Sequence, residues 1–130
     1  MKKAKRIFHL IGGANIDILG KSFETLRPSD SNPGSVSVSF GGVARNIAHN
    51  LTNIGRPVRL LTVFGDDGLG HQCAKDCKDR NMDISHSIFL KDSTSSTYLA
   101  IANKDGDMSV AIADMNILRN LKKDMVQPFL

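Results

Sequence analysis

The stretch Ser39-Phe40-Gly41-Gly42-Val43-Ala44-Arg45-Asn46 joins an alternating, strand-like run to a helical one through two adjacent glycines. Glycine permits backbone conformations that other residues avoid, and it lets a ligand approach the backbone closely. The first N–H groups of a helix have no partner within the helix, so they can donate to an oxygen-rich ligand. Asn46 falls in the first turn of the expected helix. The stretch therefore predicts a ligand-binding floor made of Gly41, Gly42 and Asn46.

The residues after the glycines favour a helix that ends before Pro57. Gly55 stands where a left-handed C-cap is expected, and Pro57 stops any continuation. Four apolar residues recur at helical spacing, and we expect them to form the buried face: Val43, Ile47, Leu51 and Ile54.

Three apolar runs predict the strands of a core sheet, over residues 7–19, 58–64 and 84–90. Near-continuous apolar runs are typical of parallel strands that are buried on both faces. Because a helix is expected between each pair of runs, the order predicts an α/β fold with a parallel sheet and flanking helices. A moderately helical run over residues 117–125 follows near the end of the chain.

Two polar residues interrupt the first apolar run. A charged residue in an apolar strand costs several kcal/mol unless it is paired or reaches solvent, so Asp17 needs a reason to be there. Asn15 and Asp17 are two positions apart and point to the same side of an extended chain. Both could face a common pocket. The alternative is that Asp17 caps a neighbouring turn or pairs with an arginine.

A second group of strands predicts a small sheet beside the binding floor. Residues 35–40 alternate strictly between serine and apolar residues, which is typical of a half-exposed strand. Residues 97–103 and 108–112 alternate around Lys104-Asp105-Gly106-Asp107, and its Asp-Gly pair is a strong hairpin signal. We expect the two parts to form a β lid, with Thr97 at its base near the ligand.

The turn Gly65-Asp66-Asp67-Gly68-Leu69-Gly70 precedes a helix expected to run to about Arg80. Its aspartates are placed to cap the helix. A phosphate cradle is the alternative, but two acidic residues repel an anion, and neither dinucleotide-binding nor P-loop spacing is present. Cys73 and Cys77 share a face of this helix and are expected to be buried free thiols, with a metal or redox pair as the alternative.

The totals indicate one globular domain of 130 residues, with 41% hydrophobic and 23% charged residues and a formal charge of +4. One tyrosine and no tryptophan disfavour a nucleic-acid binder. No segment has the length of a membrane span, and we expect a cytoplasmic protein. A sheet of about three strands has open edges. We therefore expect more chain, or a homodimer through the lid or the open sheet edge.

Three motifs in this order resemble the PfkB, or ribokinase-like, family of sugar and nucleoside kinases: Gly12-Gly13-Ala14-Asn15-Ile16-Asp17, Phe40-Gly41-Gly42-Val43-Ala44-Arg45-Asn46 and Gly65-x-Asp67-x-x-Gly70. The resemblance implies that Asp17, the amides of Gly41 and Gly42, and the Asn46 side chain hold a small-molecule sugar or nucleoside, enclosed by Asn15 and the lid. It also implies that the intact enzyme uses ATP with Mg²⁺. Ser31-Asn32-Pro33-Gly34 and residues 111–115 are most similar to the nucleoside kinases of the family.

One departure from the family pattern limits the expected activity. Family members continue into a second half with an ATP site and a glycine-rich anion hole that ends in the catalytic aspartate, and this sequence has no Gly-Ala-Gly-Asp-like motif. Residues 1–130 are therefore expected to be the N-terminal substrate-binding and lid portion, with no catalytic residue, no metal ligand and no tight ATP binding. The alternative is a non-catalytic nucleoside-binding or self-associating module.

Overall fold

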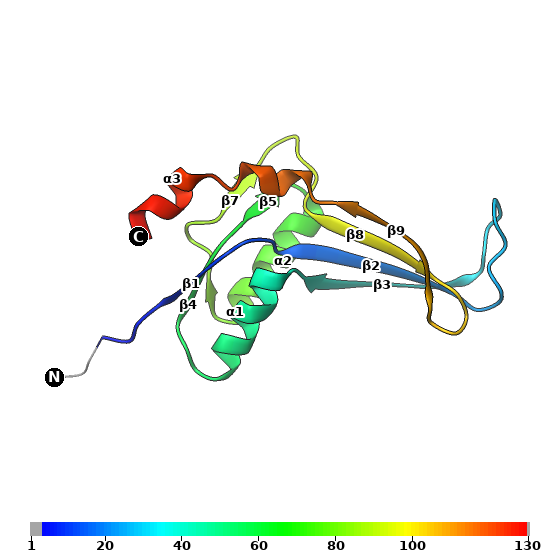
Figure 1. Cartoon of the computed structure of the whole chain (residues 1–130), viewed down its shortest axis with the longest axis horizontal. Coiled ribbons are helices and arrows are strands. Elements are labelled where there is room, and N and C mark those ends of the chain that lie inside the picture. The colour runs from blue at the N-terminus through cyan, green and yellow to red at the C-terminus, as the bar shows by residue number, and fades with distance from the viewer. Residues whose placement is uncertain (1–3, 130) are drawn as a thin grey trace.

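The computed structural model describes residues 4–129, which form an α/β body with a projecting arm of strands (Figure 1). In the body, β1 (Phe8–Ile11), β4 (Val58–Leu61) and β6 (Met82–Asp83) make a parallel sheet in the order β1-β4-β6. A second parallel pair joins β5 (Val63–Gly65) to β7 (Ile88–Leu90). Helix α1 (Val43–Asn53) leads into β4, and helix α2 (Gly68–Asp79) connects β5 to β6. The predicted α/β fold with parallel strands and flanking helices is confirmed.

The arm is a separate four-stranded sheet in the order β3-β2-β8-β9. It consists of β2 (Asn15–Ser22), β3 (Gly34–Gly41), β8 (Thr97–Ala102) and β9 (Met108–Asp114). The β2 strand pairs parallel to β8, and the other two pairings are antiparallel. The predicted hairpin and its neighbour strand therefore share one small sheet, and its strands run together away from α1 and α2 (Figure 1). We call this sheet the lid.

The prediction of a single buried strand over residues 7–19 is wrong. The chain turns at Gly12 and Gly13, so its two halves belong to different sheets, β1 to the body and β2 to the lid. Phe8 and Ile11 are about half exposed rather than buried. Apolar residues continue on both sides of Gly12 and Gly13, so the composition of the run carries no signal for a change of sheet.

The predicted core strands 58–64 and 84–90 are also each divided. The first is buried except at the half-buried Arg59, and it breaks at Thr62, where the chain passes from the β1-β4-β6 sheet to the β5-β7 pair. Ser87 fills the break, since its hydroxyl donates to the Leu60 carbonyl and accepts from the Thr62 N–H at 3.0 Å. The second run forms β6 and β7, with a turn between them.

Helix α1 begins and ends where the sequence predicts, and Gly55 takes the left-handed conformation at its end. The predicted buried face is wrong at three of its four positions, and Leu51 is the one predicted residue that packs against the core. Val43, Ile47 and Ile54 are exposed, Val43 by 77%, whereas Ala44 and Ala48 are buried. A Cβ on Gly12 would lie 3.0 Å from the Ala44 Cβ, so only a face of small side chains lets α1 approach the β1–β2 turn this closely.

Helix α2 starts as predicted, with Asp67 as its N-cap accepting from the Gly70 N–H at 2.7 Å. Cys73 and Cys77 are both free and buried in the core, as predicted. The hydrogen bond with Cys77, together with burial, raises the pKa of the Cys73 thiol. The core gathers these thiols, the small face of α1 and the buried strands around Leu60 and Phe64.

The predicted helix over residues 117–125 is replaced by three short pieces. A 3₁₀ turn η1 (Asn116–Asn120) precedes α3 (Lys123–Val126) and a second 3₁₀ turn η2 (Gln127–Phe129). The Phe129 ring stacks on His9 of β1 at 5.1 Å and lies under the Arg59 guanidinium of β4 at 4.7 Å. In the described part of the chain, no helix combines the length and apolar character that a membrane crossing requires.

Candidate functional site

The site lies where β2 leaves the body and meets the last residue of β3. Asn15 is the register partner of Gly41, and Asp17 is the partner of Ser39, so both side chains lie on one face of the lid, as the two-residue spacing predicted. The Asp17 carboxylate lies directly over Gly41, because a Cβ there would be 2.2 Å from Asp17 Oδ2. Only glycine leaves room for the carboxylate in this position.

Gly42 turns the chain from the lid into α1. Its φ of +95° is favoured by glycine, and a Cβ would lie 2.3 Å from the Gly13 carbonyl oxygen. The Gly13 carbonyl also accepts from the Arg45 N–H at 3.4 Å, and the Gly42 carbonyl accepts from the Asn46 N–H at 2.9 Å. The two glycines thereby hold the first turn of α1 beside the start of β2.

Asn46 lies in that first turn and is exposed. Its Oδ1 accepts from Arg45 Nη1 at 3.2 Å. Arg45 is itself only 4% exposed, and its Nη2 forms an ion pair with Asp76 of α2. Because arginine can only donate, Asn46 must direct Oδ1 to Arg45, which leaves its Nδ2 as the free end of the amide.

Asn15 is fixed in a similar way. Its Oδ1 accepts from the hydroxyl of Ser96, which is buried at the base of β8, at 2.8 Å. The same oxygen would lie 3.0 Å from a Cβ on Gly13. The amide of Asn15 is therefore held at the base of the lid, on the face that carries Asp17.

The structure does not bring Thr97 to this group. Thr97 is the register partner of Ile16, so its side chain lies on the opposite face of the lid from Asp17, and its hydroxyl donates to the Ser95 carbonyl at 2.7 Å. The residue of β8 beside Asp17 is Tyr98. The alternation of apolar and polar residues predicts which lid residues share a face. It does not predict which of the two faces carries Asn15 and Asp17.

The electrostatics of the site centre on Asp17. Burial raises the pKa of this carboxyl above its ordinary value, and the positive charge of Arg45 only partly offsets the rise. The site thus pairs a carboxylate, which accepts hydrogen bonds, with the donating amide end of Asn46. This combination suits a ligand with neighbouring hydroxyl groups, since each hydroxyl can both donate and accept.

The Gly65–Gly70 turn is built as a structural joint. Asp67 accepts from the Gly70 N–H and also from the N–H and hydroxyl of Ser95, at 3.0 and 2.9 Å. Although burial opposes it, these bonds hold the pKa of Asp67 below its ordinary value. The Gly70 N–H, which a phosphate cradle would need as a donor, already donates to Asp67.

ATP with Mg²⁺ finds no fitting site in residues 4–129. Within that range, no group of three or more His, Cys, Asp or Glu side chains is placed to hold a metal ion. The turn that comes nearest to a phosphate cradle carries the engaged carboxylate of Asp67.

The matching family model is that of the pfkB family carbohydrate kinases, and it matches residues 8–129. This chain belongs to the PfkB family. The resemblance inferred from the three motifs is thereby confirmed. The match includes every residue of the site described above.

Relatives in the PfkB family agree with this assignment but are much longer. The chain is 39% identical to the uncharacterized sugar kinase YeiI of Escherichia coli (strain K12), over 90% of this chain and 32% of that protein. It is also 39% identical to the pseudouridine kinase of the same strain, over 83% and 34%. The guanosine-inosine kinase of Exiguobacterium acetylicum is 31% identical, over 80% and 34%. The chain spans about a third of the length of these relatives.

Solved structures place the fold in the same family. A Clostridium perfringens protein described as a sugar kinase superposes with a TM-score of 0.86 at 32% identity, over 97% of this chain and 40% of that one. The carbohydrate kinase from Agrobacterium tumefaciens gives a TM-score of 0.77 at 32% identity, over 88% and 36%. The partial ribokinase-like fold predicted from the motifs is confirmed.

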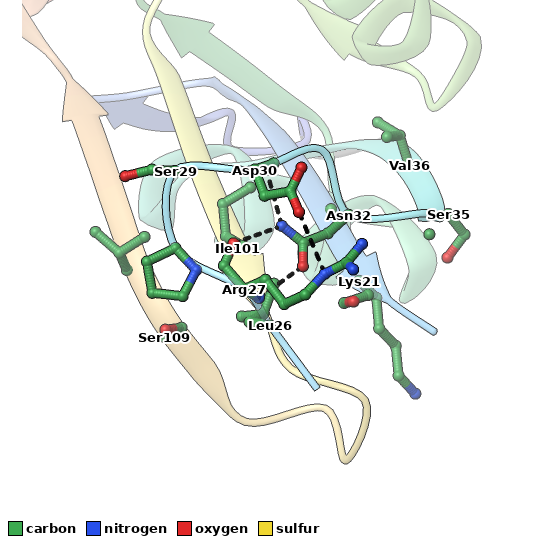
Figure 2. Close-up of a pocket in the computed structure, with 15 residues that line it drawn as sticks. Lys21, Leu26, Arg27, Ser29, Asp30, Asn32, Ser35, Val36, Ile101 and Ser109 are labelled. Carbon is green, nitrogen blue, oxygen red and sulfur yellow. Dashed lines mark hydrogen bonds and ion pairs between the residues drawn. The ribbon is translucent and has the colours of Figure 1, made fainter. Parts of the chain in front are cut away.

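A cavity of about 590 Å³ lies elsewhere, at the far end of the lid (Figure 2). It lies between the loop that joins β2 to β3 and the lid residues Val36, Ile101 and Val110. Asn32 holds the loop, since its amide accepts from the Arg27 N–H at 2.7 Å and donates to the Arg27 carbonyl at 3.0 Å. None of the six residues predicted for ligand binding lines it.

Three residues of the site escaped sequence reasoning. Arg45 lies inside the second motif, but its partner Asp76 is 31 positions away, a pairing that no local pattern reveals. Ser96 belongs to a polar run that reads as loop. Tyr98 could have been predicted, because strand alternation puts it on the opposite lid face from Thr97, which is the face of Asp17.

Proposed function

We propose that this chain forms the nucleoside-binding and lid part of a kinase that phosphorylates the 5′-hydroxyl of a ribose, with pseudouridine as the substrate. The single observation that carries the proposal is the Asp17 carboxylate seated over Gly41, in the space that a Cβ would occupy. A half-buried carboxylate with a raised pKa is costly to keep in a strand. Binding a hydroxylated ligand gives a reason to keep it.

In this proposal Asp17 accepts a hydrogen bond from one ribose hydroxyl, and Nδ2 of Asn46 donates to the next. The N–H groups of Gly41 and Gly42 donate to the ligand at the start of α1, where the partial positive charge of the helix favours an oxygen-rich group. Asn15 closes the site at the base of the lid. Thr97 is not included, because it lies on the opposite lid face.

The phosphoryl donor in the complete enzyme would be ATP with Mg²⁺. Phosphoryl transfer depends on positioning the two reactants and stabilising the charge on the moving group. In this proposal the described residues hold the sugar, and no group of three or more His, Cys, Asp or Glu side chains among them is placed to hold a metal ion. We therefore expect the 130-residue chain to bind nucleoside without phosphotransferase activity, and Asp17 to hold the sugar rather than act as general base.

The choice of substrate is the finer part of the proposal. Equal identity to a sugar kinase and to a pseudouridine kinase leaves both sugar and nucleoside as candidates. The Ser31-Asn32-Pro33-Gly34 and 111–115 stretches, which resemble those of pseudouridine kinase, favour the nucleoside.

Isothermal titration of the purified chain with pseudouridine, uridine and ribose tests the proposal directly. We expect pseudouridine to bind most tightly and Asp17→Ala to abolish binding. Asp105→Ala is the matched control, because Asp105 is an exposed aspartate in the β8–β9 turn at the other end of the lid. Binding that survives in Asp17→Ala, or that is lost equally in the control, would contradict the assigned site.

A second function, self-association through the lid, is favoured by one observation. The lid face opposite Asp17 is apolar but exposed, with Val36 exposed by 74% and Ile112 by 66%. The same face carries Val38, Leu99 and Val110. A second copy presents the identical face, so the two lids could pack about a twofold axis. A monomer at all concentrations in sedimentation equilibrium would exclude this function.

A further inference from the structure

Arg45 is the least expected residue of the site region. It is an arginine in the first turn of α1 and is only 4% exposed, so its charge is almost entirely removed from solvent. Its Nε is buried without a hydrogen-bond partner among the described residues. A buried donor left unsatisfied costs stability.

A purely structural role would not require this residue. Buried ion pairs can often be replaced by apolar residues of similar size without loss of stability. The partner Asp76 also has a second cation, since Arg80 Nε lies 3.1 Å from each of its carboxylate oxygens. Asp76 would stay paired without Arg45, so the contact between α1 and α2 does not explain why an arginine is kept there.

One end of the Arg45 guanidinium instead contacts a proposed ligand-holding group, Asn46. Nη1 donates to Asn46 Oδ1 at 3.2 Å, and the backbone N–H of Arg45 reaches the Gly13 carbonyl at 3.4 Å. Nη2 is held by Asp76, so the rigid planar guanidinium has one end anchored in α2 and the other on Asn46. Its charge also acts on Asp17.

We propose that Arg45 is a positioning residue, which holds the Asn46 amide with Oδ1 turned inward and Nδ2 turned to the ligand, using Asp76 of α2 as its anchor. The inference rests on the proposed nucleoside site. It adds to that site the residue that fixes Asn46 as a hydrogen-bond donor to the ligand. A site with Asn46 fixed as donor and Asp17 as acceptor favours a ligand whose adjacent groups are one acceptor and one donor. With the amide free to flip, Asn46 is no longer fixed as the donor.

Two substitutions separate the charge of Arg45 from its shape. Arg45→Met removes both the charge and the donors at nearly constant length. Arg45→Lys keeps the charge but loses the planar fork that joins Asn46 to Asp76. Arg80→Met is the matched control, since it removes the other cation from Asp76 and touches His49 rather than Asn46.

The first measurement needs no ligand. The Asp17 carboxyl is titrated by ¹³C NMR, and the side-chain amide of Asn46 is followed in ¹⁵N spectra. We expect Arg45→Met to raise the Asp17 midpoint and to shift and broaden the Asn46 amide signals. In Arg45→Lys the midpoint should stay near that of the wild type while the Asn46 signals still change. Arg80→Met should leave both unchanged.

The second measurement is pseudouridine affinity by isothermal titration. Loss of one oriented hydrogen bond predicts about tenfold weaker binding in both Arg45 variants and about unchanged binding in Arg80→Met. Wild-type affinity in Arg45→Lys, or unchanged Asn46 signals in a folded Arg45 variant, would overturn the positioning role. If the wild type binds no nucleoside, the proposed function fails, while the NMR comparison still decides whether Arg45 orients Asn46.

Discussion

Replacing Gly41 by alanine is the sharpest test of how the site is built, because it adds a single methyl group. That Cβ would lie 2.2 Å from Asp17 Oδ2 and 3.2 Å from Asp17 Cγ. Since carbon and oxygen atoms that are not bonded do not approach so closely, the carboxylate must move by about 1 Å, and functional groups need to be held to roughly 0.5 Å. The backbone of Gly41 lies in a strand and has no positive φ, so alanine fits it without strain.

The expected result separates binding from folding. The carboxylate is the end of a rotatable side chain, so Gly41→Ala should change the free energy of unfolding by less than about 1 kcal/mol. Misplacing a charged hydrogen-bond acceptor should cost about 1.5–3 kcal/mol of binding, which weakens pseudouridine affinity roughly 10- to 100-fold. Titration calorimetry measures the affinity, and urea denaturation measures the stability.

Gly68→Ala is the matched control, since a Cβ on Gly68 meets nothing within 4 Å. Both quantities should stay at their wild-type values in this variant. The reasoning would be refuted by Gly41→Ala protein that is folded and binds pseudouridine as tightly as the wild type. It would equally be refuted if Gly41→Ala unfolded the chain, because the close contact would then serve packing rather than the site.

Four further predictions follow from the charges and exposed surfaces. Asp17→Asn should raise the free energy of unfolding at pH 7 while abolishing nucleoside binding, because the raised pKa of Asp17 means that its ionised form costs stability in the folded state; lower stability in urea denaturation would contradict this. Asp67→Ala removes the N-cap of α2 and should cost about 2–4 kcal/mol in the same assay, whereas a loss below about 0.5 kcal/mol would rule out a structural turn. The pKa of Asp83 is about 2 in the folded protein, so its contribution is complete above the unfolded value of about 3.9 and is lost as the pH falls from about 4 to about 2; acid denaturation of Asp83→Asn should lack this part of the slope. Val38→Asp should shift any dimer to monomer in sedimentation equilibrium without changing the circular dichroism spectrum, and an unaltered dimer would place the interface elsewhere.

Much of the fold follows from local signals in the sequence. The strand-to-helix turns at Gly42 and Asp67 start helices where predicted, because a positive φ and a side-chain cap are requirements of a few adjacent residues. The β8–β9 hairpin follows from its Asp-Gly turn for the same reason. Such features depend on chain geometry over two to four residues, so they can be predicted without knowledge of the rest of the molecule.

What could not be predicted depends on partners that are distant along the chain. The run 7–19 is mostly apolar on both sides of Gly12, yet Gly12 divides it between two sheets, a choice set by β4 on one side and β8 on the other. The large residues Val43 and Ile47 indicate a buried face by size, but close packing on the β1–β2 turn selects Ala44. Periodicity identifies the apolar residues of a helix, not the distance at which it packs.

The site itself depends both on local strand periodicity and on pairing with a distant strand, which sets the register. Period two puts Asn15 and Asp17 on one lid face and Ile16 and Ile18 on the other, and pairing Asn15 with Gly41 decides which of them meets the start of α1. A slip of one residue would turn the carboxylate to the face that carries Ile16, which is fully buried in the core, and would bury its charge there. Because Gly41 alone leaves room for that carboxylate, the glycine pair and the aspartate work as one unit. A substitution at Gly41 should therefore disturb the ligand site through Asp17, and one at Gly42 should disturb it through the Gly13 carbonyl, even though neither glycine has a side chain to contact the ligand.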